Sequence, residues 1–293
     1  MPEKPEVITV TKKLERRLKG RKITDCQVIY DPIIDCPSAK EFCTRIKGQT
    51  MHEFTTRGKW IVITLDQDYL LIHLRMEGKF FFREKRVPLE KHHHVIFTID
   101  DEEELHFQDV RKFGRMKLIP KDKILTMPPF TELGLEPWDK NLTVEYLKEH
   151  LKKKKIPIKT ALLDQSIITG IGNIYDDEIL FLSHIYPLKP ACLLTDEELE
   201  AIIKNTVITL DKAIQEGGTT IHSFTSEEGV SGLFQNHLYV HTKAGNPCPR
   251  CGTEIIKMKV NGRGTYYCPE CQRQDIKAVS YTHLRAHETR GNL

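Results

Sequence analysis

The stretch Cys248-Pro-Arg-Cys251 is followed, after residues 252–267, by Cys268-Pro-Glu-Cys271. Two Cys-x-x-Cys pairs at this separation are typical of one tetrahedral zinc ion held by four thiolates. Two disulfides or four unligated cysteines are the alternatives. Because four thiolates leave no open coordination position, the sequence predicts one structural zinc ion rather than a catalytic one.

The residues between the pairs are numerous enough for a two-stranded hairpin. Gly262 and Gly264 lie in its middle, where a turn needs a permissive backbone. Lys257, Lys259 and Arg263 make the hairpin basic. A rigid basic hairpin is suited to binding the phosphates of a nucleic acid.

The composition limits where such a surface can lie. The chain has 293 residues, with 44 Lys and Arg against 41 Asp and Glu, so its formal net charge is only +3. A nucleic-acid surface must therefore be a local face. The length suits two domains in addition to the zinc hairpin.

The remaining cysteines and the chain start indicate an intracellular protein. Cys26, Cys36, Cys43 and Cys192 lack ligand spacing, which favours reduced thiols. No apolar run reaches membrane-spanning length, and the charged start has no signal-peptide core. We expect a soluble cytoplasmic protein without membrane contact.

The N-terminus combines a predicted helix, residues 5–18, with an unusual start. Removal of Met1 would leave Pro2 with a free secondary amine, which is partly unprotonated near neutral pH and nucleophilic. Such an amine forms an iminium with an aldehyde-like carbon, and Glu3 could act as an acid beside it. An ordinary helix start is the alternative, since proline is common there.

From residue 23 to 119 the apolar pattern changes to that of short strands. We predict strands at 23–30, 60–65, 69–74, 79–83, 94–99, 104–107 and 115–119. Many short strands after one helix predict a β-sandwich domain.

Three loops of this domain contain lysine or arginine. Two of them also contain an apolar residue that we expect at an exposed loop tip. Residues 55–59 contain two cations before a strand, 73–78 contain Met76, and 108–114 contain Arg111 and Phe113. Core packing is the alternative for either apolar residue. An exposed apolar residue beside arginine is suited to entering a base stack.

The second half of the chain is helical. Residues 121–141 are proline-rich and predict a linker, and we predict helices at 143–151, 159–164, 174–183 and 195–215. Thr143 is a predicted N-cap, and Thr195 with Glu198 forms a predicted capping box. The overall fold class is therefore α+β.

Gly170-Ile-Gly-Asn173 is a tight turn that opens one of these helices. Backbone N–H groups at a helix N-terminus bind phosphate readily, although an ordinary helix connection is the alternative. The polar segment 217–245 predicts a mobile loop, and residues 274–293 predict a disordered or non-native tail.

Together these stretches resemble the bacterial formamidopyrimidine-DNA glycosylases over about residues 2–273. The resemblance rests on the following stretches: Met1-Pro2-Glu3, Pro5-Glu6-Val7, Arg57-Gly58-Lys59, His73-Leu74-Arg75-Met76, Lys91-His92, residues 109–114, residues 170–175, residues 217–220 and the four cysteines.

The resemblance implies roles for these residues. Pro2 would attack C1′ of the damaged nucleotide, with Glu3 as the acid, Lys59 as a proton donor in β-elimination and Arg263 assisting δ-elimination. Met76, Arg111 and Phe113 would fill the space left by the extruded nucleotide. The backbone would be held by His92, Lys154, Lys159, Asn173 and Tyr175, and the lesion loop would contain Thr219 and Thr220. Cys248, Cys251, Cys268 and Cys271 would bind the zinc.

The implied organisation is a catalytic β-sandwich domain at 2–120, a linker at 121–141 and a helix-two-turn-helix domain at 142–240. The lesion loop would be 217–237 and the zinc finger 241–273. The partner would be double-stranded DNA with oxidised bases or abasic sites, bound by a monomer. Lys4, Ile8 and residues 241–243 depart from the family pattern near functional positions.

Other functions remain open at this stage. A related glycosylase of the endonuclease VIII type would share Pro2, Glu3 and the finger but act on oxidised pyrimidines. A non-catalytic zinc protein that binds DNA lesions, with Pro2 blocked or disabled by Ile8, is a second alternative. A zinc-ribbon transcription or RNA factor would explain the finger alone.

Overall fold

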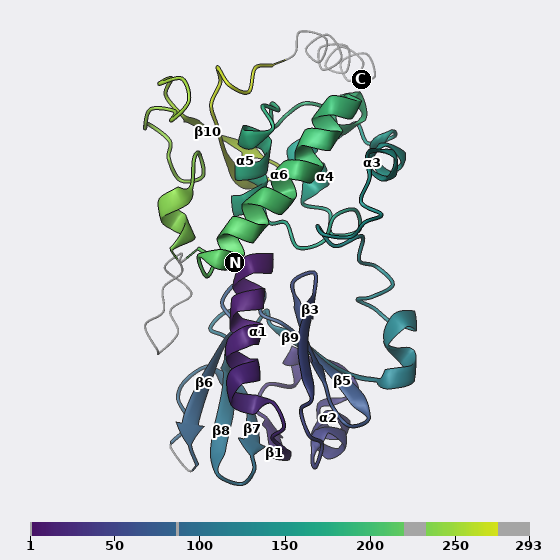
Figure 1. Cartoon of the computed structure of the whole chain (residues 1–293). Coiled ribbons are helices and arrows are strands. Elements are labelled where there is room, and N and C mark those ends of the chain that lie inside the picture. Colours follow the sequence, from purple (N-terminus) through teal and green to yellow (C-terminus); the bar gives the residue numbers. More distant parts are fainter. Residues whose placement is uncertain (1, 86–87, 220–232, 275–293) are drawn as a thin grey trace, which may run out of the picture. The chain divides into compact units, whose positions relative to one another are not determined.

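Residues 2–85, 88–219 and 233–274 are described by the computed structural model of the chain (Figure 1). They belong to two units, each with its own apolar core. Unit 1 comprises Met1–Glu132 with Ala213–Gln235, and unit 2 comprises Leu133–Lys212 with Asn236–Leu293. None of the described helices is long and apolar enough to cross a membrane.

Unit 1 contains two sheets whose strand orders are β1-β7-β8-β6 and β2-β9-β5-β4-β3. Its strands are β1 (Ile23–Val28), β2 (Ile34–Cys36), β3 (Glu53–Arg57), β4 (Trp60–Thr64), β5 (Asp68–His73), β6 (Lys79–Glu84), β7 (His93–Ile99), β8 (Glu103–Gln108) and β9 (Arg115–Pro120). The pairing is antiparallel except between β2 and β9. The helices are α1 (Lys4–Leu18) and α2 (Ala39–Ile46), with 3-10 turns at Asp31–Ile33 and Lys121–Thr126.

Both sheets and both helices of unit 1 contribute to one apolar core. Val7 and Leu14 of α1, Phe42 of α2 and Phe97 and Phe107 of the first sheet all belong to it. Figure 1 shows α1 lying along the sheets. The predicted α+β class, with a leading helix and a strand-rich N-terminal domain, is therefore confirmed.

Helix α2 and strands β2 and β3 were not predicted from the sequence. The signal for α2 was present, because Ser38 accepts a hydrogen bond from the Glu41 backbone N–H (3.3 Å) as an N-cap does. Helix α2 has only two turns, and β2 has three residues, so neither produces a readable periodicity.

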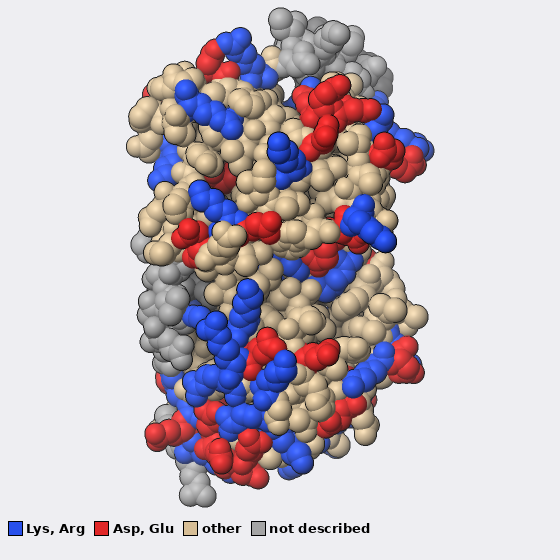
Figure 2. All heavy atoms as spheres, viewed as in Figure 1, with Lys and Arg blue, Asp and Glu red and all other residues tan. Residues whose placement is uncertain are grey.

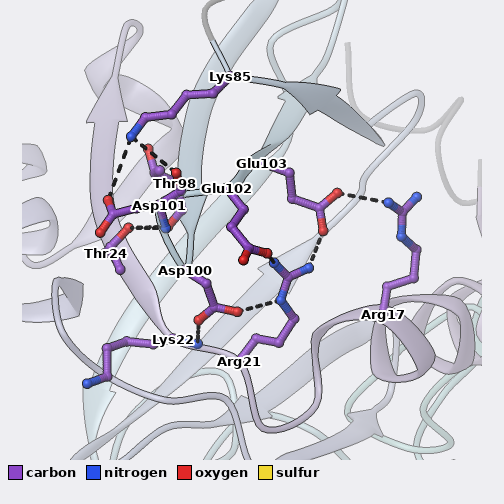
Figure 3. Close-up of polar contacts among 10 residues, drawn as sticks. All are labelled: Arg17, Arg21, Lys22, Thr24, Lys85, Thr98, Asp100, Asp101, Glu102 and Glu103. Atoms are coloured by element: carbon purple, nitrogen blue, oxygen red, sulfur yellow. Dashed lines mark hydrogen bonds and ion pairs between the residues drawn. The ribbon is translucent and has the colours of Figure 1, made fainter.

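A charged network attaches the C-terminal end of α1 to the hairpin between β7 and β8 (Figure 3). Arg21 Nε donates to Asp100 (2.6 Å), and the same guanidinium contacts Glu102 and Glu103. Arg17 donates to the other oxygen of Glu103 at 2.8 Å. This attachment fixes α1 at the end opposite to its N-terminus.

Unit 2 is mainly helical and ends in the hairpin of the finger. Its elements are α3 (Val144–Leu151), α4 (Ile158–Leu162), α5 (Asn173–Leu182), α6 (Asp196–Gln215), β10 (Ile256–Val260) and β11 (Arg263–Tyr267), with 3-10 turns at Ala191–Leu193 and Phe234–His237. Each predicted helix is present within two residues of its predicted start and end.

The predicted caps of unit 2 are confirmed. Thr143 accepts from the Tyr146 N–H at 3.2 Å, and Thr195 and Glu198 exchange two hydrogen bonds. In the hairpin, Gly262 has a φ of +78° and forms the turn with Asn261. The prediction for Gly264 was wrong: it lies within β11 opposite Lys259, so the turn does not need its flexibility.

Residues Ala213–Gln235 belong to unit 1, whereas the sequence prediction assigned them to the helical domain. The predicted lesion loop, 217–237, lies within the described residues only at its two ends. The predicted tail falls outside them beyond residue 274. The predicted linker contains the Lys121–Thr126 turn and Trp138, whose indole N–H donates to Asp211 at 2.8 Å.

Candidate active site and nucleic-acid interface

The N-terminal end of α1 is a tightly bonded region of unit 1. Pro2 is buried, and Glu3, the N-cap residue, is 1% exposed. The Glu3 N–H donates to Glu6 Oε2 at 2.8 Å. Glu6 Oε1 accepts from both the N–H and the hydroxyl of Thr219, at 2.8 and 3.2 Å. One carboxylate therefore joins the start of the chain to the described beginning of the predicted lesion loop.

Residue 218 has to be glycine, because the Glu6 carboxylate lies very close to its backbone. Its φ is +85°, and a Cβ there would lie 2.6 Å from Glu6 Oε1. Any side chain at residue 218 would therefore push Glu6 away from Thr219. This packing explains Gly218 and Thr219.

Lys59 follows the tight turn at Gly58, between β3 and β4, and is 7% exposed. Helix α1 packs against β3, and Lys4 Nζ lies 3.4 Å from the Thr56 carbonyl oxygen. The structure therefore brings Pro2, Glu3 and the turn before Lys59 to the same end of unit 1. The catalytic roles that the resemblance implies for Pro2, Glu3 and Lys59 stay predictions.

His73 lies at the end of β5, beside this turn. Its ring packs edge-on against Trp60 at 5.0 Å, and its Nδ1 accepts from the Arg75 N–H at 3.0 Å. Burial, with the cations of Arg75 and Lys59, lowers the pKa of His73 to about 3. His73 is therefore a neutral acceptor at physiological pH.

Phe107 brings the two predicted wedge loops together. A Cβ on Gly78 would lie 2.8 Å from its ring, and a Cβ on Gly114 would lie 2.6 Å from it. Both glycines are therefore needed where the loops containing Met76 and Phe113 cross this ring. The loops converge because two backbones can approach one aromatic side chain.

Asp109 organises the loop 109–114. It is fully buried, and its carboxylate accepts from the N–H groups of Arg111 (3.0 Å) and Gly114 (2.6 Å). Phe113 is 46% exposed, and the Arg111 guanidinium lies 4.9 Å from its ring centre. Phe113 is thus at an exposed loop tip, as predicted, rather than in the core.

Met76 and His92 are both half-buried. His92 has a φ of 72°, and its carbonyl oxygen accepts from the Asp109 N–H at 3.0 Å. His92, for which the resemblance implies a contact with the DNA backbone, therefore lies next to the loop 109–114.

In unit 2, one glutamine side chain forms hydrogen bonds to the backbone of the turn before α5. Gln165 accepts from the Gly170 N–H and donates to the Ile171 carbonyl, both at 2.9 Å. Asn173, the first residue of α5, donates to the Gly264 carbonyl at 2.9 Å. The helix N-terminus is thereby fixed beside the exposed Arg263, as a phosphate site requires.

Two predicted backbone contacts, Lys159 and Tyr175, are buried side chains in this structure. Both are 0% exposed. The Lys159 ammonium donates to Asp177 at 2.6 Å and lies 3.6 Å from Asp176. A phosphate contact needs a solvent-facing group, so these two residues have internal roles here. Lys154 is half-buried and pairs with Asp164 at 3.1 Å.

The Lys159–Asp177 pair extends to the segment that enters the finger. His241 Nδ1 donates to the second oxygen of Asp177 at 2.6 Å. Glu178 accepts from three successive backbone N–H groups, those of residues 239–241, at 2.7 to 3.0 Å. Burial raises the pKa of Glu178 above its ordinary value, against the effect of these donors. His241, one of the residues that depart from the family pattern, therefore makes a buried hydrogen bond.

The four cysteines fit a zinc ion. Their sulfur atoms lie within 4.8 Å of one another, and Sγ–Sγ distances of 3.5 and 3.8 Å link neighbouring pairs. Zn–S bonds of about 2.3 Å in a tetrahedron put sulfurs about 3.8 Å apart. Among the described residues, no other group of His, Cys, Asp and Glu has this arrangement.

The finger packs on α5 through a small apolar core. Phe181 of α5 belongs to one buried cluster with Val240, Cys248, Ile255 and Cys268. Arg250 stacks on the Phe181 ring at 4.4 Å and donates to its carbonyl oxygen at 3.0 Å. On the face drawn in Figure 2, Lys and Arg lie among Asp and Glu over most of the surface.

Sequence reasoning assigned no role to Glu6, Asp109, Gln165 or Glu178. Asp109 has a local signal, because aspartate often accepts from the backbone N–H two residues on, as it does here from Arg111. Glu6 has one as well, since it caps the Glu3 N–H three residues before it. Glu6 and Glu178 act on residues 213 and about 60 positions away. Nothing in a local window shows such a partner.

Three family models match consecutive parts of the chain. They are the formamidopyrimidine-DNA glycosylase N-terminal domain over residues 1–116, the H2TH domain of the same enzymes over 133–225, and the zinc finger found in FPG and IleRS over 245–274. Together they define a zinc-finger DNA glycosylase architecture.

Curated relatives and solved structures agree with these models. The chain is 45% identical to formamidopyrimidine-DNA glycosylases of an Exiguobacterium species and of Bacillus cereus, over 94% and 93% of its length and 100% and 99% of theirs. It resembles a Lactococcus lactis FPG mutant solved with DNA containing Fapy-dG, with a TM-score of 0.87 at 36% identity, covering 93% of this chain and all of that one. A MutM complex with DNA containing carbocyclic 8-oxo-G gives a TM-score of 0.86 at the same identity and coverage.

The chain therefore belongs to the formamidopyrimidine-DNA glycosylase family. Its four cysteines form the zinc finger of that family.

Proposed function

We propose that this protein removes oxidised purines, 8-oxoguanine and formamidopyrimidines, from duplex DNA and then cleaves the strand. The proposal rests on the hydrogen-bonded N-terminal end of α1. Pro2 and Glu3 lie there, at the same end of unit 1 as the turn that contains Gly58 and Lys59. Relatives solved with Fapy-dG, 8-oxo-G and abasic DNA support the substrate class. We expect the cytoplasm of a bacterium as the location, since the curated relatives are bacterial.

The proposed chemistry begins after Met1 is removed. The Pro2 nitrogen attacks C1′ of the damaged nucleotide, the glycosidic bond breaks, and the base leaves with its electron pair and a proton. Glu3 assists opening of the sugar ring, which gives an iminium between Pro2 and C1′. The iminium makes the C2′ proton acidic, so the 3′ phosphate leaves by β-elimination, with Lys59 as proton donor.

The second elimination releases the 5′ phosphate, and Arg263 stabilises its charge. Arg263 is suited to this because it is exposed and adjoins the helix N-terminus at Asn173. Hydrolysis of the remaining imine returns the free amine of Pro2. The zinc ion has no part in these steps, and its four thiolates shape the hairpin that presents Arg263.

The wedge loops compensate for base extrusion, which costs about a few kcal/mol. The exposed Phe113 and the neighbouring Met76 and Arg111 would replace lost stacking. Asn173, His92 and Lys154 would bind backbone phosphates. Thr219, bonded to Glu6, would anchor the lesion loop that contains Thr220.

The test compares two matched duplexes, one with 8-oxoguanine opposite cytosine and one with thymine glycol opposite adenine. Wild type should cleave the first much faster and Pro2→Gly and Glu3→Gln should not cleave it, with gel-resolved strand products as the readout. Each protein is first shown by intact mass to lack Met1 and by anisotropy to bind an abasic-analogue duplex.

Preferential cleavage of the thymine glycol duplex would replace the purine assignment with the pyrimidine alternative. Binding without cleavage of either duplex would identify a non-catalytic lesion-binding protein instead.

A further inference from the structure

Cys26 and Cys43 lie in sulfur–sulfur contact in unit 1. Their Sγ atoms are 3.4 Å apart, and both cysteines are free. Cys26 lies on β1 and Cys43 on α2, and these two elements pack together. The zinc motif does not use either residue, and they lie far from the finger in sequence.

The surroundings keep the two sulfurs together. Both side chains are partly buried and pack against the unit 1 core, to which α2 contributes Phe42 and Ile46. Cys26 is held in register by the pairing of β1 with β7, where it lies opposite Phe97. A strand and a helix packed on one core cannot easily separate the sulfurs.

Both residues are also only partly buried, so a small oxidant can reach them. Burial, followed by the neighbouring Cys43, raises the pKa of the Cys26 thiol far above its ordinary value. Cys26 is therefore a weak nucleophile while its thiol is protonated, because the thiolate is the reactive form.

We propose that Cys26 and Cys43 form a reversible disulfide when the protein meets hydrogen peroxide. The sulfurs need to approach by only about 1.4 Å to reach the S–S bond length of about 2.05 Å, which side-chain rotation can supply. The oxidant belongs to the class of species that also produces oxidised purines in DNA.

The chemistry balances in two steps. The Cys43 thiolate attacks one peroxide oxygen, the O–O bond breaks, and after proton transfer the products are a sulfenic acid and water. The Cys26 sulfur then attacks the Cys43 sulfur, the S–O bond breaks, and the Cys26 proton leaves with the hydroxide as water. Two thiols lose two electrons, and one peroxide is reduced to two water molecules.

The bond would enclose a segment whose ends are 17 positions apart and would attach α2 to β1. Restricting this segment in the unfolded chain raises stability. Reduced and oxidised protein should therefore differ in thermal stability, with the oxidised form several degrees more stable. Catalysis should be unchanged, because neither cysteine belongs to the site described above.

The test treats full-length, zinc-loaded protein with graded hydrogen peroxide, then blocks free thiols with N-ethylmaleimide before denaturation. The intact mass of the oxidised wild-type protein should be about 2 Da lower before alkylation, and this protein should accept two fewer N-ethylmaleimide groups. Dithiothreitol should reverse both changes. Cys26→Ser and Cys43→Ser should each abolish the effect. Cys36→Ser is the matched control, since it alters a nearby cysteine outside the pair, and it should keep the bond.

Peptide mapping in the Cys36→Ser background assigns the linkage, because Cys26 and Cys36 share one tryptic peptide. Zinc release is followed in parallel with a chromogenic chelator. A 26–43 linkage formed with zinc retained supports the proposal. Oxygen added to Cys43 without linkage, or label loss confined to the four finger cysteines, would overturn it.

Discussion

The N-terminal end of unit 1 and the α5–finger region of unit 2 are fixed by different means. The first is held by hydrogen bonds from the backbone N–H groups of Glu3 and Thr219 to the Glu6 carboxylate. The second is held by the buried Lys159–Asp177 ion pair, by the hydrogen bond between His241 and Asp177, and by four cysteines suited to zinc. A reacting amine has to exchange bonds during turnover, whereas a phosphate-binding surface only has to stay in place. The comparison predicts that unit 2 tolerates the loss of its fixing groups less well.

Zinc removal should have the largest effect. Structural zinc contributes about 10–16 kcal/mol to the folding of isolated fingers, and the sulfurs of Cys248 and Cys268 form part of the finger core. Cys268→Ser should lose zinc and weaken binding to an abasic-analogue duplex by about 100-fold or more, measured by anisotropy at fixed salt. Cys192→Ser is the control and should bind normally. Unchanged affinity in a variant shown to lack zinc would contradict the role of the finger.

Breaking the buried ion pair should come next. Lys159→Met leaves Asp177 and Asp176 buried without their cation, which should cost about 3–5 kcal/mol in urea unfolding. The matched control is Lys154→Met, because the Lys154–Asp164 pair has both side chains 34% exposed and should cost less than about 1 kcal/mol. Equal losses in the two variants would show that burial does not govern this pair.

The pH dependence of unit 1 should reveal His73. Its folded pKa, about 3, lies below the unfolded value of about 6.5, so the unfolded chain binds the extra proton. His73 therefore leaves stability unaffected above pH 6.5 and lowers it progressively as the pH falls from 6.5 towards 3. The slope should be at most about 1.4 kcal/mol per pH unit.

His73→Gln, which keeps an acceptor for the Arg75 N–H, should flatten this part of the stability profile. An unchanged profile between pH 6.5 and 4 would mean that His73 does not titrate as described.

The smallest effect should follow loss of the carboxylate that joins the N-terminus to the lesion loop. Glu6→Gln keeps one acceptor oxygen and replaces the other by an amide that cannot accept from Thr219. We expect about a tenfold slower release of 8-oxoguanine in single turnover, equivalent to one hydrogen bond of about 1.4 kcal/mol. Strand cleavage at a preformed abasic site should change less. Thr219→Ser retains both donors and serves as the control.

Local patterns predicted the parts of the structure that depend on neighbours in sequence. The helix caps at Thr143 and Thr195 and the turn at Gly262 follow from side chains within four residues. The cysteine spacing likewise gave the metal site. The α+β class followed from the change of apolar period between the two halves.

The remaining features depend on tertiary contacts. The resemblance implied a DNA-backbone contact for Lys159, but its side chain is buried in an ion pair with Asp177. Tyr175 was predicted to bind DNA and instead fills the core. The bond between Glu6 and Thr219 joins residues 213 positions apart, so no local pattern predicts it. No residue pattern within one window could have shown these pairs.

The most direct test is to locate the covalent bond itself. Wild-type protein is trapped with borohydride on a duplex containing 8-oxoguanine opposite cytosine, digested, and the modified peptide is sequenced by mass spectrometry. Our account predicts a secondary-to-tertiary amine link at Pro2 of a chain that lacks Met1. A link at Lys4 or Lys59, the buried amines at the same end of unit 1, would contradict the assignment of Pro2 as nucleophile.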